Sequence, residues 1–185
     1  MSIRAGETFD VARAVADLDA LLAAPLPASG PTVAEGDPVT GEWAASEGES
    51  FRIVPLWESD SQGLRGEEWD EAEETAEAHL AALVAELEGR WGPHHRVAVH
   101  VLLLVKESGE HQSSLLREDG QEVPPLLDAL LAQDCYGDLA AWGPVPGQGR
   151  WAGVSVGRSD GDAPLVMTAV VSDRPIVAPD PPSWL

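Results

Sequence analysis

The sequence predicts an α+β fold, in which a mostly antiparallel sheet of about five to six strands carries two to three helices packed on one face. The longest helical pattern runs from about 67 to 90, and short strand-like runs crowd the last third of the chain. Helical and strand segments do not alternate regularly, whereas regular alternation is typical of doubly wound parallel sheets. The length of 185 residues suits one main domain.

The first predicted element is an amphipathic helix over residues 8–24, within an N-terminal segment 1–24. Its apolar residues recur at three- and four-residue spacing, and Pro25 follows the last of them. Residues 25–49 hold four prolines and four glycines and are predicted to form a linker or a long irregular loop. We therefore expect the helix to dock loosely on the rest of the chain, or only with a partner.

The predicted globular body spans residues 50–172 and begins with a strand at 51–57. Pro55 cannot donate to a sheet ladder, which indicates an edge strand or a bulge. A polar loop at 59–66 precedes the most regular helical pattern of the chain, residues 67–90. Its apolar residues fall on one face of the helix and its acidic residues spread over the other side.

The middle of the body is predicted to contain a hairpin. The apolar run 96–106 is short and continuous, which is typical of a central strand buried on both faces. A turn at 107–110 and a second strand at 111–118 complete the hairpin. A short helix is then expected to begin at Pro124 and Pro125.

The last third of the body is predicted to form a meander of three short strands. The strands are expected at 139–142, 151–157 and 165–171, with turns rich in Gly, Pro and Asp between them. The tail 173–185 holds four prolines and is expected to be extended and poorly ordered unless Trp184 anchors it.

Acidic side chains dominate the charge of the chain. The sequence has 32 Asp and Glu against 11 Lys and Arg, a formal net charge of −21. Nucleic-acid backbones and anionic membranes attract basic patches, so direct binding to either is disfavoured. A basic protein is the favoured partner. The alternative is background composition, since a chain with one lysine and no asparagine has the skew that a GC-rich genome produces.

No motif specifies a reaction, so we expect no catalytic residue, no cofactor and no metal site. The glycines at 147–149 precede a predicted strand, whereas phosphate-binding loops precede a helix. His94 and His95 are adjacent, so their side chains diverge and make a poor ligand pair. Cys135 is flanked by acidic residues that oppose formation of a thiolate.

The sequence also predicts a cytoplasmic location. No apolar run reaches the ~18–20 residues that cross a bilayer, and the N-terminus shows no secretory signal. A lone cysteine forms no internal disulfide, which is typical of a reducing compartment.

The leading hypothesis is a non-enzymatic acidic domain that binds another, basic protein. Candidates are an immunity- or antitoxin-like inhibitor of a basic toxin, or a secretion-type chaperone, because dense carboxylates speed the encounter with a cationic partner. The predicted contact is the acidic side of helix 67–90 with the adjoining loop. Its residues are Trp57, Asp60, Glu67, Glu68, Asp70, Glu71, Glu74 and Glu77.

Two other functions stay open. One is an enzyme with His100 or His111 as the acid/base group, in a pocket between 97–118 and 143–149. The other is a structural subunit of a larger assembly, tethered by its first helix and its proline-rich tail. The sequence leaves the oligomeric state open.

Overall fold

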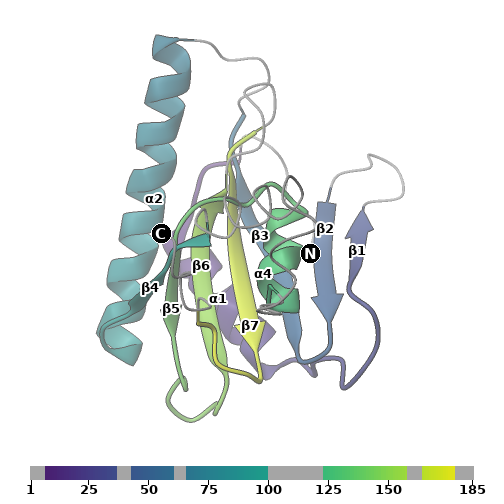
Figure 1. Cartoon of the computed structure of the whole chain (residues 1–185). Helices are drawn as coiled ribbons and strands as arrows, with labels where there is room; N and C mark the ends of the chain where they lie inside the picture. Colours follow the sequence, from purple (N-terminus) through teal and green to yellow (C-terminus); the bar gives the residue numbers. More distant parts are fainter. Residues whose placement is uncertain (1–6, 37–42, 61–65, 100–122, 158–163, 178–185) are drawn as a thin grey trace, which may run out of the picture.

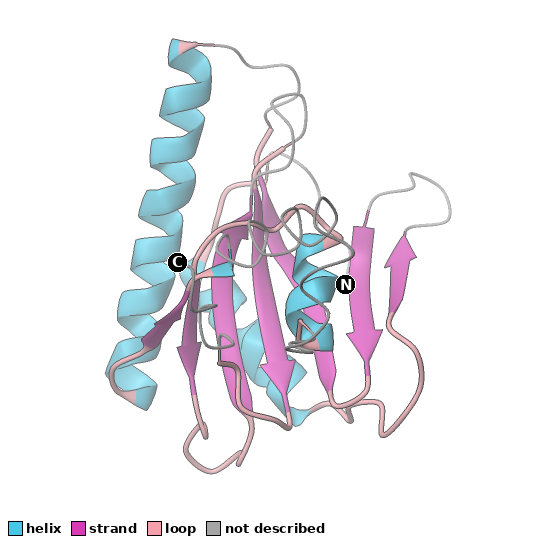
Figure 2. Cartoon of the chain, in the orientation of Figure 1, coloured by secondary structure: helices cyan, strands magenta, loops and turns pink. Residues whose placement is uncertain are grey.

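The computed structural model describes residues 7–36, 43–60, 66–99, 123–157 and 164–177. Within these ranges the chain forms a sheet with helices on both sides (Figures 1 and 2). The helices are α1 (Val11–Ala23), α2 (Glu67–Trp91) and α4 (Pro125–Leu131). The strands are β1 (Val33–Gly36), β2 (Trp43–Gly48), β3 (Phe51–Glu58), β4 (His95–Val97), β5 (Leu139–Trp142), β6 (Trp151–Gly157) and β7 (Val166–Ser172).

The sheet has seven strands in the order β1-β2-β3-β7-β6-β5-β4, and each neighbouring pair is antiparallel. The predicted α+β class with an antiparallel sheet is therefore confirmed, with more strands than the five to six expected. The meander at the end of the body is also confirmed. Strands β5 and β6 have the predicted bounds, and β7 is shifted by one residue.

The additional strands β1 and β2 lie inside the segment 25–49, where a linker or an irregular loop was expected. That expectation missed them because their residues lack a clear apolar alternation, and all four residues of β1 are exposed. Gly48 permits a close contact in the β2–β3 hairpin, since a Cβ there would lie 2.4 Å from Cε1 of Phe51. Glycine therefore allows strand packing here and does not mark a break.

The helices cover both faces of the sheet, which corrects the expectation that they pack on one face. Leu18 of α1 and Leu83 of α2 are buried against one face, in a core that includes Ala169 of β7. Leu127 of α4 is buried on the other face together with Ile53 of β3. The central strands are buried on both sides, so each face requires its own apolar cover (Figure 1).

The described start of the apolar run 96–106 lies in an edge strand and not in a central one, and residues 100–106 lie outside the described residues. Strand β4 ends at Val97, lies at the end of the strand order and pairs with β5. Val97 and Val99 are buried in the core on the α4 side, which explains their apolar character without a central position. The predicted turn at 107–110 and strand at 111–118 lie outside the described residues.

Helix α1 is docked on the body, in contrast to the loose docking expected. Asp10 caps its N-terminus, with its carboxylate accepting hydrogen bonds from the amides of Ala12 (2.8 Å) and Arg13 (3.1 Å). At the other end, the Arg150 guanidinium donates to the carbonyl oxygens of Leu22 (2.6 Å) and Ala24 (2.5 Å). The isolated chain therefore provides α1 with polar partners at both ends.

Two further expectations concern Pro55 and the C-terminal tail. The register of β3 against β7 shifts between Pro55 and Trp57, which confirms a bulge within an inner strand.

The first part of the tail is packed, since Ile176 is 2% exposed and its carbonyl oxygen lies 2.9 Å from Nε2 of His95. Trp184 lies outside the described residues. None of the helices described is long and apolar enough to cross a bilayer.

Candidate protein-binding surface

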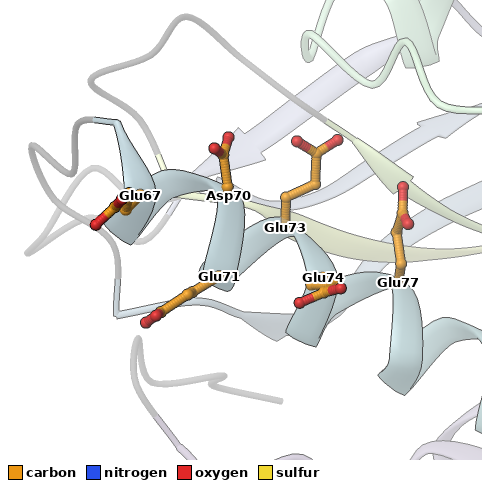
Figure 3. Close-up of a pocket in the computed structure, with 6 residues that line it drawn as sticks. All are labelled: Glu67, Asp70, Glu71, Glu73, Glu74 and Glu77. Atoms are coloured by element: carbon orange, nitrogen blue, oxygen red, sulfur yellow. The ribbon is translucent and has the colours of Figure 1, made fainter.

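The first half of α2 carries a dense group of exposed carboxylates, which we call the acidic face. Its members are Glu67, Asp70, Glu71, Glu74 and Glu77. At about 100° per residue, Glu67, Glu71 and Glu74 lie on the side of α2 opposite the buried Ala76, and Asp70 and Glu77 lie on one flank of the helix. Figure 3 shows Asp70 and Glu77 pointing to one side of the helix, and Glu71 and Glu74 to another. The acidic face is therefore broad and follows about three helical turns.

The carboxylates of the acidic face have no cationic neighbour. No Lys, Arg or His side chain lies within ion-pair distance of any of the five, as far as the described ranges extend. The arginine of α2 itself, Arg90, lies in the last turn and pairs with Asp19 of α1 at 2.8 Å. The negative charge of this helix half is therefore directed at solvent.

The arginines that the structure describes pair with carboxylates elsewhere. Their pairs are Arg13–Glu7, Arg52–Glu47, Arg90–Asp19, Arg96–Asp138, Arg150–Asp173 and Arg174–Glu49. None of these acids belongs to the acidic face. Among the described residues, charge compensation is therefore uneven: ion pairs lie along the sheet and α1, whereas the carboxylates of the acidic face on α2 have no described ion-pair partner.

A hollow of about 470 Å³ lies along the acidic face. Its described lining consists of the five members of the face and Glu73, all acidic. The first turns of α2 extend past the ends of the strands (Figure 1). The chemistry of the hollow suits ammonium and guanidinium groups.

The structure places the other predicted contact residues differently. Asp60 is exposed at the end of β3, and Glu68 is exposed on α2 but about 100° around the helix from Glu67. Trp57 is 7% exposed, and its indole nitrogen donates to the carbonyl oxygen of Glu7 at 2.9 Å. Trp57 thus packs in the core between the sheet and the helices, and its side chain does not join the acidic face.

A second concavity, which we call the groove, lies between α2 and the β5–β6 side of the sheet. Its volume is about 590 Å³. Leu80, Ala81 and Val84 of α2 form one wall, and Val156 of β6 and Leu165 before β7 form much of its floor. Sequence reasoning missed the groove because it depends on where α2 crosses the sheet, a relation that no local pattern reports.

Polar side chains surround the apolar floor of the groove. Glu73 and Glu77 line it on the α2 side, so the groove and the acidic hollow share these two residues. Arg96 and Asp138 pair with each other on the far side, beside Tyr136. Asp138 thus balances the charge of Arg96, and the described rim of the groove keeps a net negative charge.

The neighbouring histidines His94 and His95 both have structural partners. His94 Nδ1 lies 2.9 Å from a carboxylate oxygen of Glu88, and its ring packs against Trp142 with centroids 5.5 Å apart. The ring of His95 packs edge-on against Trp151. Over the described ranges no group of three potential metal ligands comes together. His100 and His111, the alternative acid/base residues, lie outside these ranges.

Cys135 is a poor nucleophile in this structure. Its side chain is 2% exposed and its sulfur donates weakly to the carbonyl oxygen of Gln133 at 3.4 Å. Burial, with the nearby charge of Asp134, raises the pKa of the thiol to about 12. The expectation of an inert cysteine thus agrees with its surroundings.

Comparisons with protein-family models, curated proteins and solved structures give no match.

Proposed function

We propose that this chain is a protein-binding domain that uses the acidic face of α2 to bind a basic protein. The observation that supports it best is the concentration of five exposed carboxylates that have no counter-ion among the described residues, while the described arginines pair with other acids. A field of one sign raises the association rate with an oppositely charged partner and orients it.

Helix stability accounts for part of this charge. Glu67 and Asp70 lie in the first turn, where carboxylates interact favourably with the positive end of the helix dipole. That effect fades beyond the first turn, whereas like charges four residues apart, such as Asp70 and Glu74, repel by a few tenths of a kcal/mol. The helix dipole therefore does not account for Glu74 and Glu77, which favours a role in binding over background acidity.

Within this proposal, the partner is a basic toxin that the chain inhibits or a basic secreted protein that it chaperones. Both partners present cationic surfaces that must be covered until needed, and both are met in the cytoplasm. Inhibition predicts a complex that blocks the partner's activity, whereas chaperoning predicts a complex that keeps the partner soluble.

Capture from the native host tests the proposal. The double variant Glu71→Lys, Glu74→Lys reverses two charges of the acidic face. The matched control Glu35→Lys, Glu86→Lys makes the same change at exposed carboxylates elsewhere. We expect the wild type and the control to retain a basic protein, the face variant to lose it, and capture to fall between about 50 and 500 mM salt. Equal capture by all three proteins would contradict the proposal.

A further inference from the structure

Among the described residues, the groove is an apolar concavity beside α2 that no described helix covers. The contacts of α1 and α2 with the sheet concentrate on β7 and β6. Ala140 of β5 and Val156 of β6 remain partly exposed on this side, and both line the groove. Apolar surface in a concavity of this size is typical of a binding site.

We propose that the groove binds a basic amphipathic segment of the partner protein, with apolar side chains on its floor and Lys or Arg side chains against Glu77 and the acidic face. This inference rests on the proposed function and specifies what the partner must present. Under this inference, apolar contacts in the groove add to the electrostatic attraction of the acidic face.

Charge complementarity identifies the occupant as basic. Glu77 belongs to both concavities, so a segment on the groove floor continues directly onto the acidic face. On the opposite rim Arg96 is neutralised by Asp138, so a cationic segment meets no uncompensated positive charge there. An acidic segment would instead face the uncompensated carboxylates of α2.

The apolar side chains of the groove indicate that electrostatic attraction is only one part of the proposed contact. Leu165 is fully buried at the base, and Leu80 and Val84 are partly buried on the α2 wall. Hydrophilic cations would leave the exposed parts of Leu80 and Val84 against water, whereas a Leu, Ile or Phe side chain would remove them from it. Buried apolar anchors within a charged rim are the usual source of affinity in such interfaces.

Two synthetic peptides serve as probes for this site. The first is an 18-residue Leu/Lys peptide whose leucines recur at three- and four-residue spacing, and the second has the same composition in an order that spreads the leucines around a helix. Fluorescence anisotropy with the full chain measures both affinities at low salt. We expect the amphipathic peptide to bind at least about tenfold more tightly than the scrambled one.

A pair of neighbouring alanines provides the matched variants. Ala81 lines the groove and Ala82 does not, and both are exposed on α2, so Ala81→Arg and Ala82→Arg add the same charge to a tolerant position. Ala81→Arg should lower the affinity for the amphipathic peptide about tenfold, and Ala82→Arg less than about twofold. Equal melting temperatures establish that both variants are folded.

The other outcomes separate the two proposals. Equal affinity for both peptides, with no difference between the alanine variants, would overturn the groove inference and leave the acidic face as the binding surface. A lack of binding by either peptide at low salt would count against both proposals. Self-association of the chain that Ala81→Arg abolishes would assign the groove to a second copy, and so would overturn the inference.

Discussion

His79 of α2 lies in an aromatic contact that holds the segment before α1. Its ring stacks on Phe9 with centroids 4.7 Å apart and meets Trp57 edge-on at 5.0 Å. The Nδ1 atom is buried and has no hydrogen-bond partner. Desolvation lowers the pKa of His79 below its ordinary value of 6.5. The cluster is therefore built around a neutral imidazole.

This arrangement predicts a loss of stability in mild acid. Because the pKa of His79 is lower in the folded than in the unfolded chain, the unfolded chain binds the proton first. The contribution of neutral His79 is fully present above pH 6.5 and is lost as the pH falls through the folded-state pKa. The free energy of unfolding should therefore decrease between about pH 7.5 and 5.5.

Urea titrations of the wild type and His79→Phe measure this effect. Phenylalanine keeps the stacking but does not titrate, so the variant should lose less stability than the wild type over this pH range. Parallel pH profiles for the two proteins would show that His79 has no part in the acid sensitivity.

Arg150, just before β6, provides the polar contacts at the C-terminal end of α1. Arg150 bonds the last carbonyls of α1 and pairs with Asp173 at 2.8 Å. Replacing it with alanine removes three partners at once and leaves partly buried acceptors. We expect Arg150→Ala to reduce the free energy of unfolding by about 1–3 kcal/mol, measured by urea unfolding.

Arg174→Ala is the control for this prediction. Arg174 pairs with Glu49, and its side chain is 63% exposed. An exposed ion pair contributes about 0–1 kcal/mol, so the control should be nearly neutral. If the two alanine variants were equally stable, Arg150 would have no special role in holding α1.

The elements that could be predicted from the sequence have strong local periodicity. Helix α2 and strands β5, β6 and β7 combine regular apolar spacing with clear Gly or Pro boundaries, so local patterns specify them. Strand β1 has no such pattern, because its exposed residues depend on pairing with β2 for their backbone bonds. Apolar runs such as Val97–Val99 record burial and not the position of a strand in the sheet.

In the candidate site, too, the features with a local sequence pattern could be predicted and those that depend on tertiary packing could not. The acidic face could be found in the sequence because its residues recur on one helix. Trp57 packs in the core, which the local pattern of its strand does not show. The groove combines α2 with Val156 and Leu165, which are far away in sequence, so only tertiary packing reveals it.

Over the whole molecule, charge and apolar surface converge on one side of α2. The chain has a net charge of −21, yet its described ion pairs leave the acidic face uncompensated. The groove continues this face through Glu73 and Glu77. Together they form a surface for a partner that is both basic and amphipathic.

The association rate with the captured partner tests the central claim most directly. The rate is measured for the wild type and for two double variants. The face variant carries Glu71→Lys and Glu74→Lys, and the control variant carries Glu35→Lys and Glu86→Lys. Both double variants change the net charge by the same amount, at different places on the molecule. We expect the face variant to associate at least about tenfold more slowly at low salt, and this difference to shrink near 0.5 M salt. Equal slowing by both double variants would show that net charge, and not the acidic face of α2, governs the encounter.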